Sequence, residues 1–211
     1  MTAAVLIAVI LGWSPHLPSA DAAEIAAAVM AGAERETLDP LIVAAVIAQE
    51  SGFNADPCSR RVALDRVISR TPDAEHEDRE LLEWTCGSSS GTRSTCERTV
   101  WQVEERDGYL HVDTCPAGEV GYMQVLRSSQ WAQAGYQIPG LDEVLSRRAS
   151  ERRAQLLRPE VNIALGCREL AEHRGASDAT SADPWWTWIG AYNTGTHHGE
   201  GARRYARTIV G

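Results

Sequence analysis

The chain has 211 residues, of which 44% are aliphatic, aromatic or cysteine and 23% are charged. This composition is typical of a globular protein and excludes disorder over the whole chain, and the length predicts one domain with room for an insertion. The formal net charge of −9 argues against electrostatic binding to nucleic acid or to an anionic membrane.

The first 22 residues have features of a signal peptide. Residues 3–11 form an uncharged apolar run, and Ala20-Asp21-Ala22 has the small-x-small pattern of a cleavage site. The run is shorter than the ~20 residues that a helix needs to cross a bilayer, so no stable membrane span is expected. We therefore predict a protein exported to the periplasm or secreted, with residues 23–211 as its domain. The alternative is a buried N-terminal helix, because no Lys or Arg precedes the apolar run.

The next segment favours two helices. The Ala-rich residues 22–35 are typical of a helix. Asp39 and Pro40 have the residue types of an N-cap and a first helical turn, and residues 41–48 are all apolar. A helix that is apolar on every side is expected to be buried, and this one would end at Gly52.

The sequence changes character after Pro57. Residues 58–118 hold four of the five cysteines, and residues 99–103 and 109–112 flank an Arg-Asp-Gly turn that predicts a β-hairpin. Further helices are predicted over 141–157, over 161–173, from residue 184 onward and over about 201–210. The expected fold class is therefore mainly α, with a Cys-rich, partly β insertion at about 58–118.

The cysteines favour disulfides over a metal site. No Cys-x-x-Cys or Cys-x-x-His pair is present, which argues against zinc, and an exported protein permits disulfides. Cys58 and Cys115 flank the base of the insertion, so we favour Cys58–Cys115 together with Cys86–Cys96. Pairing of Cys96 with Cys115 across the hairpin is the competing pattern. Cys167 is expected to be a buried thiol.

Glu50 is the candidate catalytic residue. It stands at the end of an apolar helix, where partial burial and the negative end of the helix dipole both disfavour a carboxylate. Both effects raise the pKa of this side chain, and a carboxylic acid that stays protonated near neutral pH is what a general acid requires. The alternative is a solvated Glu on an exposed last turn.

Four motifs follow one another between residues 48 and 195. They are Ala48-Gln49-Glu50-Ser51-Gly52-Phe53-Asn54, Gly121-Tyr122-Met123-Gln124, Pro159-Glu160-Val161-Asn162-Ile163-Ala164-Leu165-Gly166 and Ala191-Tyr192-Asn193-Thr194-Gly195. In kind and order they resemble the motifs of the peptidoglycan lytic transglycosylases that have a lysozyme-like catalytic domain. The chain departs from that family by having Tyr122 in place of Leu and by the step of 71 positions from Glu50 to Gly121. This surplus coincides with the insertion.

The resemblance implies a lysozyme-like domain that cleaves the β-1,4 bond between N-acetylmuramic acid and N-acetylglucosamine in the glycan strands of peptidoglycan. Glu50 would protonate the glycosidic oxygen and then, as a base, take the proton of the muramic acid 6-hydroxyl, whose attack on C1 closes a 1,6-anhydro ring. One carboxylate suffices because the nucleophile belongs to the substrate, whereas ordinary glycosidases use two. No metal or organic cofactor is implied.

The same resemblance assigns substrate contacts to six other residues of the motifs: Ser51, Tyr122, Met123, Gln124, Tyr192 and Asn193. Ser51 would alternatively anchor the loop after Glu50. Tyr192 would donate a hydrogen bond to Glu50, and Asn193 would position that segment or bind a sugar amide. Without the resemblance, Tyr192 would be interpreted as a core residue and Asn193 as a helix cap.

Two other functions stay open. A hydrolytic muramidase on the same fold would need a second carboxylate to activate water, and the available groups are Glu119, Glu104, Glu105 and Asp107. A non-catalytic protein that binds peptidoglycan or an unknown envelope partner would also keep the fold. Such a protein has no reason to hold an acid at the end of an apolar helix.

Overall fold

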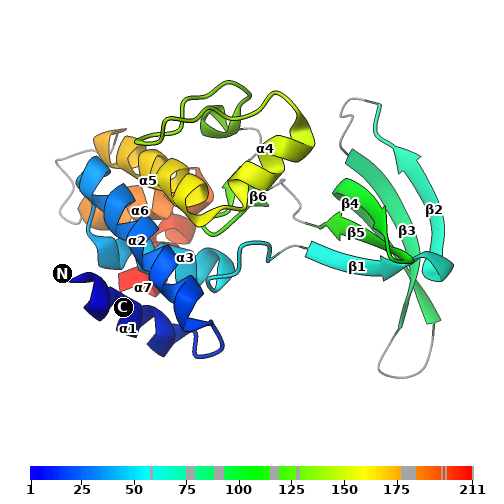
Figure 1. Cartoon of the computed structure of the whole chain (residues 1–211), viewed down its shortest axis with the longest axis horizontal. Helices are drawn as coiled ribbons and strands as arrows, with labels where there is room; N and C mark the ends of the chain where they lie inside the picture. Colours follow the sequence, from blue (N-terminus) through cyan, green and yellow to red (C-terminus); the bar gives the residue numbers. More distant parts are fainter. Residues whose placement is uncertain are drawn as a thin grey trace.

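The computed structural model of the chain describes residues 1–57, 59–74, 79–87, 93–114, 119–126, 129–176, 184–195, 197 and 199–210. Figure 1 shows a body of helices and, beside it, a twisted antiparallel sheet formed by the predicted insertion. The helical body is built from segments on both sides of the insertion in sequence.

Seven helices form the helical body in the described part of the chain. They are α1 (Ala3–Trp13), α2 (Ser19–Glu36), α3 (Pro40–Ser51), α4 (Ala149–Leu156), α5 (Pro159–Ala176), α6 (Pro184–Thr194) and α7 (Glu200–Val210). A two-stranded ladder of β6 (Glu119–Val120) and β7 (Val125–Leu126) lies against α5, and η2 (Gln130–Ala132) is a single helical turn. These elements enclose one apolar core, in which α2 packs on α5 and α6 packs on α7.

The apolar run of the predicted signal peptide forms α1, and this helix packs into the helical body. Leu6 and Ile10 have no exposed surface, and α1 contacts α2 and α3. Trp13 stacks on Phe53, with ring centroids 6.5 Å apart. This arrangement is the alternative that the sequence left open, a buried N-terminal helix, while removal of residues 1–22 on export stays a prediction. Among the described residues, none of the helices combines the length and the apolar composition that a membrane span requires.

The predicted boundaries of α3 are confirmed. Asp39 caps its start by accepting a hydrogen bond at Oδ1 from the backbone N–H of Leu41 at 2.8 Å. Gly52 ends the helix in the left-handed conformation, with φ of 59°. Val43 and Ile47 have no exposed surface, but Leu41 is 41% exposed, so the helix is not buried on every side.

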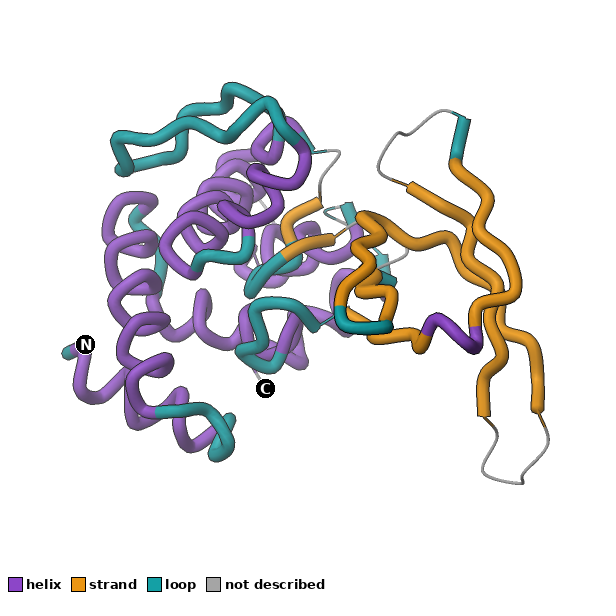
Figure 2. Tube along the Cα trace, turned by 45° about the vertical axis from the view of Figure 1, so that its right-hand side comes forward, coloured by secondary structure: helices purple, strands orange, loops and turns teal. Residues whose placement is uncertain are grey.

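The insertion forms a five-stranded sheet in the order β1-β5-β4-β3-β2. Figure 2 shows this sheet in orange beside the purple helices. Its strands are β1 (Ser59–Ala63), β2 (Val67–Pro72), β3 (Arg79–Gly87), β4 (Arg93–Arg106) and β5 (Tyr109–Asp113), with the helical turn η1 (Leu64–Arg66) between β1 and β2. Five buried residues give this sheet a small core of its own: Val62, Leu82, Val100, Leu110 and Val112. The insertion is therefore a second packed unit, larger than the single hairpin that the sequence predicts.

The predicted hairpin itself is confirmed. Strands β4 and β5 pair antiparallel, with Arg106 opposite Tyr109. The turn between them consists of Asp107 and Gly108, both with positive φ. Two successive residues with positive φ are what a tight hairpin turn requires.

The two cysteines whose side chains the structure describes agree with the predictions made for them. Cys96 is disulfide-bonded, whereas Cys167 is a free thiol whose pKa is raised by burial to about 12. The side chains of Cys58, Cys86 and Cys115 lie outside the described part of the chain. Both the Cys58–Cys115 and the Cys86–Cys96 pairing therefore stay predictions.

The predicted helix over 141–157 is wrong in its first half, because only Ala149–Leu156 is helical. The side-chain amide of Gln137 donates hydrogen bonds to the carbonyls of Leu141 at 2.8 Å and Glu143 at 3.0 Å. An isolated bridge also joins Gln137 to Val144. These bonds satisfy the backbone of the segment in a turn, so the apolar spacing of its side chains does not lead to a helix.

We predict that Leu6→Ala lowers the free energy of unfolding of the full chain by about 2–4 kcal/mol, because the truncation removes apolar burial and leaves a cavity. Val5→Ala is the matched control on the same helix, since Val5 is 53% exposed. Urea denaturation measures both variants. Equal stability of the two would mean that α1 does not pack as described.

Candidate active site

The Gly121–Gln124 motif is a tight turn between β6 and β7 that a side chain of α5 holds in place. Asn162 is fully buried; its Oδ1 accepts from the backbone N–H of Met123 at 2.7 Å, and its Nδ2 donates to the carbonyl of Val120 at 2.8 Å. Gly121 has φ of 83°, and a Cβ there would collide with the Asn162 amide. The second and third motifs are thus one structural unit, which accounts for the residue types in both.

Met123 is the point where the second, third and fourth motifs meet. Its side chain has no exposed surface and lies against Gly166, where a Cβ would overlap it. Tyr192 of α6 donates its hydroxyl to the Met123 carbonyl at 2.7 Å. Met123 therefore supports the turn from behind, and its side chain does not present a surface to a sugar. The predicted hydrogen bond from Tyr192 to Glu50 is wrong, because this hydroxyl is donated to Met123.

Glu50 is held by two other side chains. Tyr205 of α7 donates its hydroxyl to Oε1, and Asn193 of α6 forms a second side-chain hydrogen bond. Burial is the largest influence and raises the pKa of Glu50; the two hydrogen bonds oppose it, and the charge of Glu119 raises the pKa further. The pKa of Glu50 is therefore raised, as a general acid requires. A fully solvated Glu does not fit this partly buried, doubly hydrogen-bonded group.

The structure engages the other predicted residues elsewhere. The Ser51 hydroxyl donates to the Ile47 carbonyl of its own helix at 3.1 Å. Tyr122 is half-buried, and its pKa is raised by burial and by the charges of acidic residues at the start of α2 and of α5. The side-chain amide of Gln124 donates to the Gly121 carbonyl at 2.6 Å. Of the six residues, Asn193 is the one bonded to Glu50.

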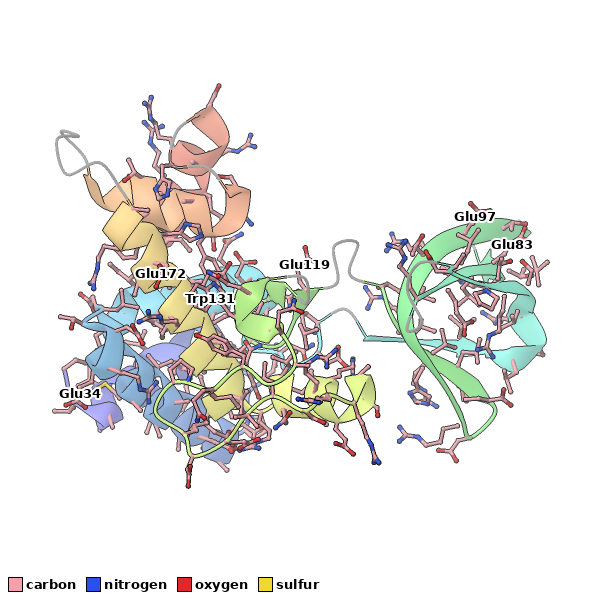
Figure 3. The ribbon with its side chains drawn as sticks, turned by 90° about the horizontal axis from the view of Figure 1, so that it is seen from above. Glu34, Glu83, Glu97, Glu119, Trp131 and Glu172 are labelled. Carbon is pink, nitrogen blue, oxygen red and sulfur yellow. The ribbon has the colours of Figure 1, made fainter. Side chains whose placement is uncertain are left out.

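Of the acidic residues considered for the alternative muramidase, Glu119 is the one whose charge raises the pKa of Glu50. It lies on β6, and Figure 3 shows it at the edge of the helical body that faces the five-stranded sheet of the insertion, here called the outer sheet. The other acidic candidates belong to the outer sheet. The charge of Glu105 contributes to the raised pKa of Arg70, and the side chain of Asp107 is 80% exposed.

Sequence reasoning missed two residues of the site. Tyr205 follows the last motif and lies 155 residues from Glu50, and its one signal is a place on the buried face of an amphipathic helix. Glu169 lies on α5, where burial and then the charge of Glu50 raise its pKa to about 7. The sequence feature that could have indicated Glu169 is an acidic residue placed between the apolar Cys167 and Leu170, both of which are fully buried.

No group of three His, Cys, Asp or Glu side chains in the described part of the chain is arranged to hold a metal ion. Comparison with known proteins gives no match, whether to a family model, to a curated protein or to a solved structure. The function is therefore inferred from the motifs and from the contacts described above.

We predict that Asn162→Ala lowers the free energy of unfolding by about 2–4 kcal/mol, because it leaves the Met123 N–H and the Val120 carbonyl buried without partners. Both residues are at most 2% exposed, so water cannot replace the amide without opening the core. Urea denaturation gives the value. A loss below about 1 kcal/mol would contradict the role assigned to Asn162.

We predict that Tyr205→Phe raises the pKa of Glu50 by about half a unit or more. The hydrogen bond from Tyr205 stabilises the charged carboxylate in the wild type, and the variant removes it. The carboxyl ¹³C shift of Glu50, followed by NMR over pH, measures this. Tyr192→Phe is the matched control, because it removes a hydroxyl that is bonded to Met123 instead. An unchanged or lowered pKa in Tyr205→Phe would contradict the described contact.

Proposed function

We propose that the chain is a lytic transglycosylase of peptidoglycan on a lysozyme-like fold, exported to the periplasm or secreted. The observation that supports this proposal is an unbroken series of contacts through all four motifs. Asn162 bonds to Met123, and Met123 bonds to Tyr192, whose neighbour Asn193 bonds to Glu50. The motifs that carry the resemblance therefore converge on the one carboxyl group that the reaction needs.

The raised pKa of Glu50 supports its role as the acid. In the protonated form it donates a proton to the glycosidic oxygen as the bond from C1 to that oxygen breaks. The carboxylate left behind keeps the hydrogen bonds from Tyr205 and Asn193, which stabilise its new charge. Burial thus makes the proton available, and the two hydrogen bonds limit the cost of giving it up.

The same carboxylate then acts as the base. It takes the proton of the muramic acid 6-hydroxyl while that oxygen forms a bond to C1, which closes the 1,6-anhydro ring and returns Glu50 to its starting form. No water is consumed, and no second carboxylate of the protein takes part.

A hydrolytic muramidase is the second candidate, and the charge of Glu119 near Glu50 is the observation that favours it. Glu119 would activate a water molecule on the opposite face of the sugar ring, in the manner of two-carboxylate glycosidases. Glu105 and Asp107 do not support this candidate, because they lie on the outer sheet. The side chain of Glu104 is outside the described part of the chain.

A non-catalytic protein that binds the wall is less well supported. Each unit by which burial raises the pKa of a carboxyl group costs about 1.4 kcal/mol for its charged form at neutral pH. A module that only binds glycan gains nothing from a carboxyl group held in this way, whereas an acid catalyst needs it.

We predict that Glu50→Gln reduces turnover of peptidoglycan at least ~100-fold, because the amide cannot donate a proton to the leaving group. Mass spectrometry of the products of the wild-type chain is expected to find muropeptides lighter by one water, without a new reducing end. Glu172→Gln is the matched control, an exposed glutamate of α5 that is bonded to Arg168. Thermal unfolding establishes that both variants are folded.

Reducing-end products would overturn the transglycosylase proposal and favour the muramidase, in which Glu119→Gln would also lose turnover. Unchanged turnover in Glu50→Gln would refute the mechanism for either enzyme. A wild-type chain without activity on several wall types would favour the binding protein.

A further inference from the structure

Helix α7 holds Glu50 with one face and exposes arginines on another. Ala202, Tyr205 and Ala206 are buried against the helical body, and Tyr205 is the residue that donates to Glu50. The exposed charged residues recur at spacings of three and four, so they share one side of the helix. This side lines a surface cavity of about 340 Å³, here called the arginine cavity, with five residues: Glu200, Arg203, Arg204, Arg207 and Thr208.

Two cations of the arginine cavity have no partner among the described residues. The guanidinium groups of Arg204 and Arg207 form neither a hydrogen bond nor an ion pair in the part of the chain that the structure describes. By contrast, Arg153, Arg158 and Arg168 of the helical body are each paired with an acidic residue. Two like charges three positions apart on a helix repel each other, so an anion bound between them is stabilised by both.

The charge of the arginine cavity is opposite to that of the whole chain. The chain has a formal net charge of −9, whereas the three arginines and one glutamate of the cavity give a local charge of +2. An acidic protein is not drawn to an anionic polymer by its overall field, so binding of such a polymer depends on a local site. The guanidinium fork matches the geometry of a carboxylate, which selects ligands that carry carboxylates.

A second cavity lies between the arginine cavity and the helix that carries Glu50. Its volume is about 440 Å³; Thr208 lines both cavities, and Gln49 of α3, the residue before Glu50, lines the second. The rest of its described lining consists of apolar side chains from α1, α3 and α7. Among these, Trp13 alone belongs to residues 1–22, whose removal is predicted, so α3 and α7 keep most of the lining in either form.

The peptide stems of peptidoglycan match both cavities. A stem is a short peptide attached to muramic acid, and it carries free carboxylates and the small side chains of alanine. A stem of four residues spans up to about 14 Å when extended, more than the ~10–12 Å diameter of a helix with its side chains. A stem on a sugar beside Glu50 is therefore long enough to reach the opposite side of α7.

We propose that the arginine cavity is an exosite for the peptide stems of peptidoglycan, in which Arg204 and Arg207 bind carboxylates of the stem and the second cavity receives its alanine side chains. The inference rests on the proposed function, because the stem is part of the same substrate. Neither arginine is directed at Glu50. The exosite therefore strengthens the binding of the substrate, which lowers KM, and takes no part in the proton transfers.

The direct test is a calorimetric titration of the full, oxidised chain with a synthetic stem peptide, alanyl-isoglutamyl-diaminopimelyl-alanine. Arg204→Gln combined with Arg207→Gln should weaken binding by about fivefold or more, because one exposed ion pair contributes up to about a factor of five. A copy of the peptide with amidated carboxyl groups should bind as weakly to the wild type as the intact peptide binds to this double variant.

Arg60→Gln combined with Arg66→Gln is the matched control. It removes the same charge from two exposed arginines of the outer sheet, and it should bind the stem peptide like the wild type. Thermal unfolding establishes that both double variants are folded.

The second arm measures turnover of glycan strands with their stems and after an amidase has removed the stems. In the wild type, removal of the stems should raise KM by about fivefold or more. In the variant that lacks both Arg204 and Arg207, KM should already be raised on intact strands, and removal of the stems should add little.

The two arms separate the failures. A wild type that does not bind the stem peptide, equal affinity for the amidated copy, or equal weakening in the outer-sheet control would each overturn the exosite. Binding to phosphatidylglycerol vesicles through Arg204 and Arg207 in place of the stem peptide would overturn it in favour of a membrane surface. An active chain whose KM is the same with and without stems would overturn it as well. A chain without turnover that binds the stem peptide through these arginines would refute the proposed function and retain the exosite.

Discussion

The structure around the candidate site depends on the two hydrogen bonds of one buried amide. Asn162 joins α5 to both sides of the β6–β7 turn, through the Val120 carbonyl and the Met123 N–H. The amide can both donate and accept, which no hydrophobic residue of that size can do. Because the turn is fixed in this way, the Met123 carbonyl points at the Tyr192 hydroxyl, and α6 is held in the position from which Asn193 reaches Glu50.

A second constraint is the concentration of carboxyl groups in the helical body. Glu50 and Glu169 both have raised pKa values, chiefly through burial, and Glu119 adds its charge to the same region. No arginine of the described part is directed at Glu50 or Glu169, although the chain has 20 basic residues. A carboxylate without a countercharge in a poorly solvated site lowers stability when it is charged, and Glu50 and Glu169 are both in this situation. Their arrangement supports the acid chemistry that we propose for Glu50.

What could be predicted from sequence follows the range of the interactions concerned. The ends of α3 are set by Asp39 and Gly52, whose capping interactions involve residues only a few positions away. The local sequence therefore predicts both ends. The contact of Tyr205 with Glu50 joins residues 155 apart, and no local pattern encodes it. Tyr192 was assigned the wrong partner for the same reason, because its motif identifies the residue and not the direction of its hydroxyl. The apolar spacing over 141–157 predicted a helix, but Gln137 satisfies that backbone from outside the segment.

The helical body accommodates the insertion because the first and last strands of the insertion are paired neighbours. Ser59 at the start of β1 pairs with Asp113 at the end of β5, so the chain enters and leaves the outer sheet side by side. The sheet also buries its own core, so the helical body does not need to supply one. The entropy cost of closing such a connection grows only slowly with its length, and the apolar core of the sheet offsets part of that cost. This explains how Gly121 can follow Glu50 by 71 positions while the charge of Glu119, two residues before Gly121, still raises the pKa of Glu50.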